Sequence, residues 1–163
     1  MFVKASMISA VFIVGFVGGL VTAAQKPESP GPPAERVTGI GGVFFKAQDP
    51  KALGVWYREK LGIAMAAPNS QLSIFRWRER DDSGQVGSTA WALFASDSKY
   101  FAPSQAALMI NYRVRDLDRM LAQLRALGVT VEPKVTEDFN GKFAWVLDPE
   151  GNKIELWEPK AGY

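Results

Sequence analysis

The side chains that this sequence offers for chemistry are restricted in kind. Its 163 residues include no histidine and no cysteine. Thiol nucleophiles, disulfides, zinc–thiolate sites and the commonest general base are therefore all excluded. Carboxylates, amides, basic groups and aromatic rings remain. A carboxylate could act as a base or help to hold a metal, and aromatic surfaces could bind a small molecule.

The composition is that of a globular domain with ample material for a core. Hydrophobic residues make up 47% of the chain, and 19 basic residues stand against 17 acidic ones, which leaves a net charge of +2. The two signs are interspersed along the chain, and no cationic stripe appears. Nucleic acid is therefore not a predicted partner.

The part of the chain that would position these groups contains an internal repeat. The segments Val43–Asp49 and Ile110–Asp116 align with each other, and each is a β-prone strand that ends on an aspartate able to cap a following helix. Each helix is expected to end at a Leu-Gly pair, Leu61-Gly62 or Leu127-Gly128, where glycine supplies a left-handed cap. The expected apolar helix faces are Leu53, Trp56, Tyr57 and Leu61 in the first copy and Leu117, Met120, Leu121, Leu124 and Leu127 in the second.

Three strands are expected after each helix. They are Ile63–Ala66, Leu72–Arg78 and Val86–Phe94 in the first copy, and Val129–Glu132, Phe143–Leu147 and Lys153–Trp157 in the second. The order βαβββ thus occurs twice, which predicts an α+β fold. Two such modules can bring their open sheet faces together as an open, barrel-like cup.

The repeat resembles the vicinal oxygen chelate superfamily, which includes glyoxalase I, bleomycin-resistance proteins and extradiol dioxygenases. We assign residues 37–163 to a domain of this kind, a glyoxalase-like domain. The resemblance is carried by Asp49-Pro-Lys-Ala-Leu53, Trp56-Tyr57 and Leu61-Gly62, by Arg113-Val-Arg-Asp-Leu-Asp118 and Leu127-Gly128-Val129, and by the turn and strand Asp148-Pro-Glu-Gly-Asn-Lys-Ile-Glu-Leu-Trp157.

The resemblance implies a divalent metal in the cup of the family's enzymes, held by one side chain from each of four equivalent strands. The corresponding positions here are Gly42, Ala92, Met109 and Glu155. Glycine and alanine donate nothing, and a thioether is a poor ligand for a hard cation. We therefore expect a degenerate metal site without a cofactor, in which only Glu155 is retained. Unusual oxygen ligands such as Asn111 leave a divalent metal as the alternative.

Alternation along the strands indicates which side chains share the cup face with those positions. The expected ligand-binding residues are Phe44, Met109, Asn111, Arg113, Glu155 and Trp157. The competing interpretation is that the aromatic rings fill a core, and that Asn111 and Arg113 form a structural network with Glu155. The linking segment Ser96–Gln105, which contains Tyr100 and Phe101, could cover the cup or pack in a homodimer, since relatives often assemble cups across dimers.

The N-terminus carries the pattern of a targeting segment. Residues 1–24 contain a single Lys near the start, a charge-free run from Ala5 to Ala24 and small residues before Gln25. This predicts either a cleaved signal peptide or an uncleaved membrane anchor through residues 5–24. Residues 25–36 are expected to form a proline-rich linker. The protein is therefore predicted to be exported to the periplasm or the exterior, or to be anchored in the membrane with its domain outside.

Two hypotheses about function follow from the sequence. The first is a metal-free binding protein that holds a small, partly aromatic molecule in the cup. The second is an enzyme of the family, either a metal-dependent lyase or dioxygenase, or a metal-free isomerase-like enzyme with Glu155 as its candidate catalytic base. The sequence leaves open which of the two is correct, and the identity of the ligand with it.

Overall fold

The computed structural model describes residues 33–79 and 84–163. The predicted signal peptide or anchor at 1–24 and linker residues 25–32 lie outside the described residues. Among the described helices, none is both long and apolar enough to span a bilayer. Pro33–Tyr163 forms a unit of its own. Its elements are β1 (Gly39–Ala47), α1 (Pro50–Leu61), β2 (Leu72–Arg78), β3 (Val86–Ala95), the 3-10 helix η1 (Lys99–Phe101), β4 (Leu108–Arg113), α2 (Leu117–Ala126), β5 (Thr130–Asp138), β6 (Gly141–Leu147) and β7 (Lys153–Pro159).

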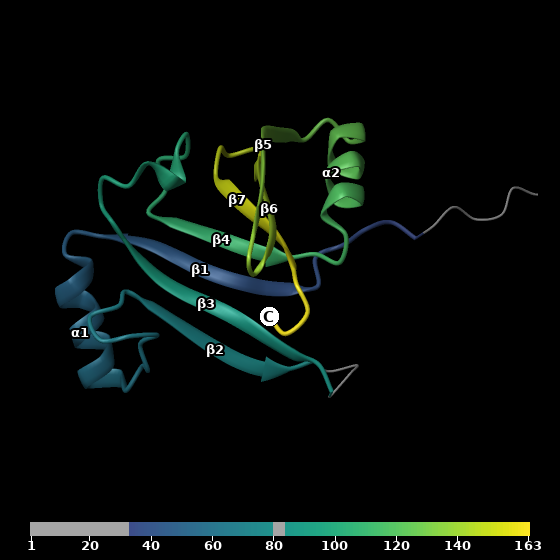
Figure 1. The fold of residues 1–163 in the computed structure, drawn as a ribbon. Helices are drawn as coiled ribbons and strands as arrows, with labels where there is room; N and C mark the ends of the chain where they lie inside the picture. Colours follow the sequence, from purple (N-terminus) through teal and green to yellow (C-terminus); the bar gives the residue numbers. More distant parts are fainter. Residues whose placement is uncertain (1–32, 80–83) are drawn as a thin grey trace, which may run out of the picture. The chain divides into compact units, whose positions relative to one another are not determined.

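The seven described strands form one mixed sheet in the order β2-β3-β1-β4-β7-β6-β5 (Figure 1). Within each half the first strand runs parallel to the last one, β1 with β3 and β4 with β7. The two halves meet where β1 pairs antiparallel with β4. The predicted α+β class and the open cup made from two similar modules are confirmed.

One strand expected in the first module is not formed. The segment 63–66 contains no strand residue, and its contacts with β2 include the Ala66 N–H donating to the Leu72 carbonyl at 2.8 Å and the Ser73 hydroxyl donating to the Ala64 carbonyl at 2.7 Å. Asn69, with a φ of 61°, turns the chain immediately afterwards. The first half therefore contributes three strands and the second half four.

The helix ends follow the sequence closely. An Asp49 side-chain oxygen accepts from the Ala52 N–H at 2.9 Å, and an Asp116 oxygen accepts from the Arg119 N–H at the same distance. These aspartates satisfy amide donors that the first turn of a helix leaves unpaired. Gly62 and Gly128 have φ values of 69° and 76°, so the chain leaves each helix through the left-handed region, as expected.

The two helices differ in how much apolar surface they bury. Helix α2 packs Leu117, Met120 and Leu121 onto the back of β6 and β7. Leu124 is partly buried against the same cluster, and only the last residue of the predicted face, Leu127, is exposed. Helix α1 buries only Gly54 fully, and two members of its predicted face, Trp56 and Leu61, are 48% and 60% exposed. The expectation of a buried α1 face is wrong for these two side chains.

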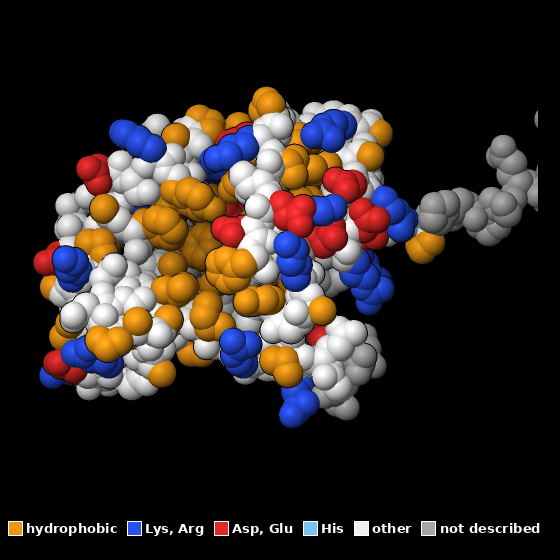
Figure 2. Space-filling view, viewed as in Figure 1, with side chains coloured by type: hydrophobic (Ala, Val, Ile, Leu, Met, Phe, Trp, Pro, Cys, Tyr) orange, Lys and Arg blue, Asp and Glu red, His pale blue; other side chains and the backbone are white. Residues whose placement is uncertain are grey.

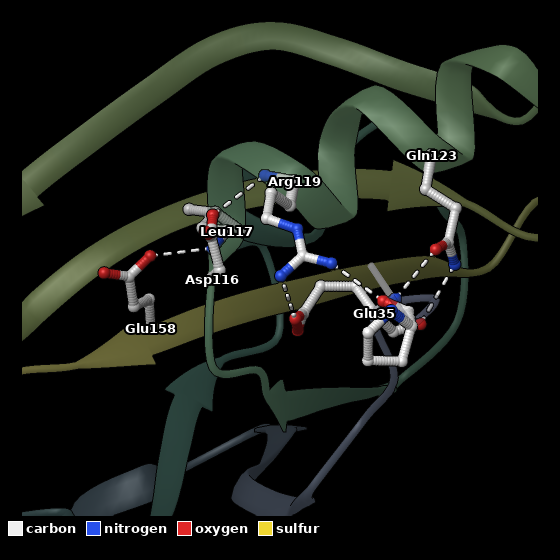
Figure 3. Close-up of polar contacts among 7 residues, drawn as sticks. Glu35, Asp116, Leu117, Arg119, Gln123 and Glu158 are labelled. Atoms are coloured by element: carbon white, nitrogen blue, oxygen red, sulfur yellow. Dashed lines mark hydrogen bonds and ion pairs between the residues drawn. The ribbon is translucent and has the colours of Figure 1, made fainter. Parts of the chain in front are cut away.

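The chain that enters the domain lies along α2. The Glu35 backbone donates to and accepts from the Gln123 carboxamide, at 2.8 and 3.0 Å (Figure 3). Arg119 donates to the Pro33 carbonyl at 2.7 Å, and its guanidinium lies 3.7 Å from the Glu35 carboxylate. Residues 33–36, the last part of the predicted linker, are thus attached to the domain by paired hydrogen bonds.

Candidate functional site

A cavity of about 510 Å³ opens on the face of the sheet opposite α2. Its volume is in the range of small-molecule sites. Figure 2 shows hydrophobic side chains gathered around a hollow in the middle of one face of the molecule. The aromatic residues that line the cavity are Phe44, Phe94, Tyr100, Phe139, Phe143, Trp157 and Tyr163.

Strand alternation explains why one face of the sheet is a core and the other a cup. On β7, Leu156 belongs to the cluster under α2, whereas its neighbours Glu155 and Trp157 line the cavity. On β6, Ala144 likewise belongs to that cluster and Phe143 lines the cavity. The second module therefore separates its two faces residue by residue.

Charged groups are scarce in the wall. Among the described residues that line the cavity, Glu155 is the sole acid and Arg76, an exposed residue of β2, the sole base. Ser88, Asn111 and Asn140 are the other polar side chains. The cavity is therefore an aromatic pocket with one buried carboxylate, a composition typical of small-molecule sites.

The Glu155 carboxylate is 2% exposed and accepts three hydrogen bonds. Its Oε2 accepts from the Trp145 indole at 2.8 Å and from the Tyr100 hydroxyl, and its Oε1 accepts from the Asn111 amide at 2.6 Å. Burial raises the pKa of Glu155, and the three hydrogen bonds and the charge of Lys153 oppose that rise only in part. The protonated acid is therefore favoured over a wider pH range than for a surface glutamate.

Tyr100 is a site residue that was expected in the linking segment but not among the ligand-binding residues. Its ring stacks on Phe94 with centroids 5.4 Å apart, and its hydroxyl reaches Glu155 from the segment that links the two modules. Burial, and then the nearby Glu155 charge, raise the pKa of Tyr100. Tyr100 lines the cavity, which is consistent with the expected role of this linking segment in covering the cup. The sequence feature that pointed to Tyr100 was the pair of aromatic residues in the linking segment. The sequence did not indicate that one of them contacts Glu155.

The first strand supplies Gly41 to the cavity wall, not Gly42. The register between β1 and β4 shifts between Ile40 and Gly42, which marks a bulge. A Cβ atom at Gly41 would lie 2.2 Å from Asn111 Oδ1 and 2.6 Å from the Trp157 ring. Gly41 thus allows two cavity-lining side chains to pack directly against the backbone of β1.

The other residues predicted at the site separate into two groups. Phe44, Asn111 and Trp157 line the cavity together with Glu155, and so does Ala92, one of the degenerate metal positions. Met109 is 1% exposed and packs in a core cluster with Phe44, Phe101 and Trp145. Met109 therefore supports the cup wall from within the core.

Arg113 lies outside the cavity. Its guanidinium sits between the rings of Trp77 and Trp157, 5.0 and 5.5 Å from their centroids, and 3.5 Å from Glu79. Burial lowers the pKa of Arg113, which the Glu79 charge partly offsets. The competing interpretation was a structural network of Asn111 and Arg113 with Glu155. Asn111 does bond to Glu155, whereas Arg113 has partners of its own.

The donor set of the cup does not fit the family's metal. Within the described residues no three carboxylate side chains are close enough together to hold an ion. Of the four positions expected from the family, Gly42 and Met109 do not line the cavity; its wall presents Gly41, Ala92, Asn111 and Glu155, and the Glu155 oxygens already accept three hydrogen bonds. One carboxylate and one amide oxygen fall short of the three or four protein ligands typical of a zinc site.

Comparison with known proteins identifies the family of this domain. A family described as a glyoxalase-like domain matches residues 42–157. No curated protein matches the chain. The structure is similar to Streptomyces coelicolor methylmalonyl-CoA epimerase in complex with 2-nitronate-propionyl-CoA, with 20% identity, a TM-score of 0.54, and coverage of 75% of this chain and 97% of that one.

A second solved structure extends the likeness to larger proteins. Homoprotocatechuate 2,3-dioxygenase from B. fuscum is 18% identical, with a TM-score of 0.52, over 79% of this chain and 34% of that one. At these identities the similarity of the structures shows the fold, whereas the family match covers most of the chain and includes both modules. The chain therefore belongs to the glyoxalase-like domain family, within the vicinal oxygen chelate superfamily.

Proposed function

We propose that this domain is a binding protein that holds a small, partly aromatic molecule in its cup, without a metal. The observation that carries the proposal is the cavity of about 510 Å³ with aromatic walls. Apolar, concave sites with a few convergent polar groups are the usual form of small-molecule pockets. Asn111 and Glu155 provide those polar groups, and Trp157 and Phe143 provide parallel ring surfaces.

A thermal-shift screen with a chemically diverse library tests the binding role. Aromatic compounds should raise the melting temperature, and the shift should disappear in Trp157→Ala and in Asn111→Ala. Phe75→Ala is the matched control, because Phe75 is 45% exposed on β2 and does not line the cavity. A broad library without a hit on the wild-type protein would contradict the proposal.

The metal-free state has a separate test. Protein purified without chelators is expected to contain no stoichiometric Zn, Fe, Ni or Mn by elemental analysis. A stoichiometric metal that is lost on Glu155→Ala would overturn this part of the proposal and would favour a metal-dependent enzyme.

A metal-free enzyme is the second candidate, and one observation favours it. Glu155 lines the cavity, and burial raises its pKa, as is useful for a general base that works near neutral pH. A reaction of this class would move a proton from a carbon atom next to a carbonyl group to the carboxylate and back.

Proton exchange distinguishes the enzyme from the binding protein. Aryl ketones incubated with the protein in D₂O would exchange the hydrogen next to the carbonyl, as followed by NMR, and Glu155→Gln would abolish the exchange. If the same ketones bind but their hydrogen exchange is no faster than in buffer without protein, the enzymatic candidate would be refuted and the binding role would stand.

We further propose that the domain is exported, to the periplasm or the exterior, either free after cleavage before Gln25 or anchored through residues 5–24. Cell fractionation and the mass of the purified protein test this. A full-length protein found in the cytosol would contradict it, and a full-length protein found in the membrane fraction would identify the anchor.

A homodimer is the proposed assembly. Val55, Trp56 and Leu61 leave apolar surface exposed on α1, and such surface is unusual on a monomer when it is contiguous. Light scattering coupled to size exclusion should give twice the monomer mass, and Trp56→Glu should reduce it. A monomer mass for the wild-type protein at all concentrations would refute this assembly.

A further inference from the structure

The buried carboxylate of the cup has no cationic partner. Among the described residues, Glu155 forms no ion pair, and its hydrogen-bond donors are a phenol, an indole and an amide. Its Oε2 accepts two of these bonds and its Oε1 accepts one, whereas a carboxylate oxygen can accept two. Oε1 therefore retains an acceptor position in a residue that lines the cavity.

The one cation whose charge acts on this carboxylate among the described residues, Lys153, has other partners. Lys153, two residues earlier on β7, lies 3.2 Å from Glu132 and donates to the Ala102 carbonyl at 3.0 Å. Its ammonium faces the ring of Trp145 from 5.3 Å. Lys153 therefore lowers the pKa of Glu155 through space but does not neutralise it at contact.

Three further basic side chains near the cup do not reach Glu155 either. Lys46 and Lys134 lie over the rings of Phe101 and Trp145, at 5.0 and 5.8 Å, and neither lysine lines the cavity. Arg76 lines it but is exposed, on β2. The carboxylate is thus buried without a counter-charge, a costly state that an incoming cation would relieve.

A second acceptor lies beside the first. Asn111 is 2% exposed, and its Oδ1 is buried without a hydrogen-bond partner, while its amide nitrogen donates to Glu155. Oδ1 lies against Gly41, which also lines the cavity. A buried acceptor without a partner is rare in folded proteins, because leaving it unpaired is costly. Asn111 and Glu155 together offer two acceptor positions on neighbouring strands, paired in register.

The walls complement a flat cation. Phe143 and Trp157 lie nearly parallel, with an interplanar angle of 5° and ring centroids 6.0 Å apart, and Phe44 and Tyr100 also line the cavity. Aromatic faces attract cations, most strongly where water is excluded. From the unpaired carboxylate, the unpartnered amide oxygen and these rings, we propose that the cup binds a planar aromatic molecule bearing a cationic nitrogen with N–H groups, which donate to Glu155 and Asn111.

This assignment rests on the proposed binding function and names its ligand class. A bound cation stabilises the ionised form of Glu155, so it lowers the pKa of that carboxyl group from its raised value. When the pH lies near or below that raised pKa, binding of the cation therefore releases a proton. The affinity for the cation increases as the pH rises through the pKa of Glu155. A neutral ligand of the same shape lacks this dependence.

Three probes of one shape and three charges test the ligand class: 2-naphthamidine, 2-naphthamide and 2-naphthoate. Isothermal titration of the full-length protein at neutral pH should give an affinity about tenfold higher for the amidine than for the amide. Glu155→Gln should remove that preference and retain binding of the amide. Glu137→Gln is the matched control, because it removes one negative charge from an exposed side chain on β5 and should leave the preference intact.

Each other result overturns the assignment in a recognisable way. Equal affinities for the amidine and the amide would refute the cationic class and leave the binding function standing. If the naphthoate bound most tightly, the site would prefer an anion, and Arg76 would be its expected partner. Binding of none of the three probes, with no hit in the library screen, would overturn the binding function itself.

A pH series on the wild-type protein keeps the test valid if Glu155→Gln does not fold. The affinity for the amidine, which stays protonated throughout, should fall as the pH decreases through the Glu155 titration, while the affinity for the amide stays constant. Parallel curves for the two probes would refute the assignment without any variant.

Discussion

Glu155 stands at the strand position where the family resemblance implies a metal ligand, and here three neutral donors hold it. The same carboxylate is one of the polar groups of the binding proposal, the candidate base of the enzymatic alternative and the group that sets the proposed ligand class. Its neighbours Tyr100, Trp145 and Asn111 are donors that fix its orientation. At the scale of residues, the cup is an aromatic pocket around one hydrogen-bonded acid.

The stability of the protein should fall as Glu155 ionises. Because burial raises the folded-state pKa above the ordinary value of 4.5, the contribution of this group is fully present below that value and is lost as the pH rises through the folded pKa. Relative to Glu155→Gln, which does not titrate, the wild-type protein should lose free energy of unfolding as the pH rises from 4.5 through the raised folded-state pKa. Urea denaturation at a series of pH values measures this difference, and a constant offset would contradict the raised pKa.

Gly41 should resist substitution more than its neighbour on the same strand. An alanine Cβ at Gly41 would overlap Asn111 Oδ1 and the Trp157 ring, whereas at Gly39 it would meet only Trp77 at 4.0 Å. Gly41→Ala is expected to lower the free energy of unfolding by about 1–3 kcal/mol and to weaken ligand binding. Urea denaturation of both variants checks this, and equal effects at the two glycines would show that the close packing at Gly41 is unimportant.

At the scale of elements, the helices and their caps follow the repeat, but the two modules use them differently. Helix α2 covers an apolar core, whereas α1 leaves Trp56 and Leu61 exposed. The entering chain at 33–36 is attached to α2 by Gln123 and Arg119 (Figure 3). Helix α2 thus has two roles: it closes the core and fixes the start of the domain.

Gln123→Ala should release the entering chain from α2. The Glu35 N–H loses its acceptor and the Glu35 carbonyl loses its donor, so hydrogen exchange at the Glu35 amide should become faster, by about tenfold for each 1.4 kcal/mol lost. Arg125→Ala, an exposed change on the same helix, is the control and should leave that amide unchanged. Unchanged exchange in Gln123→Ala would mean that other contacts hold the segment.

At the scale of the whole domain, the two modules share a sheet and a core. The strands β1 and β4 pair across the seam, and the cluster of Phe44, Phe101, Met109 and Trp145 draws on both modules and the segment between them. Neither half completes this cluster alone. The cup is therefore a property of the assembled pair of modules.

Unfolding of the domain should be a single cooperative transition. Because the shared cluster is lost when either module opens, far-UV circular dichroism and tryptophan fluorescence should give the same urea midpoint. Two separated transitions would show that the modules are independent units, and the seam at β1 and β4 would then be only a weak contact.

Much of the fold could be predicted from the sequence because its signals are local. The capping residues Asp49 and Asp116, the glycines at 62 and 128, and the alternation around Glu155 act within a few residues, and the structure has them as expected. The strand expected at 63–66 failed for a local reason too: the turn at Asn69 follows at once, and the segment forms only scattered bonds to β2.

The sequence by itself determined the two-module α+β fold, the absence of histidine and cysteine ligands, and the cup face that carries Phe44, Asn111, Glu155 and Trp157. Only the tertiary structure decided that Gly41 takes the place of Gly42, that Arg113 pairs elsewhere, and that Tyr100 reaches Glu155. The physical reason is that a bulge, a stacked guanidinium and a contact between modules depend on atoms distant in the chain. Periodicity reports which face a side chain lies on, whereas its partner is set by the packing of the whole domain.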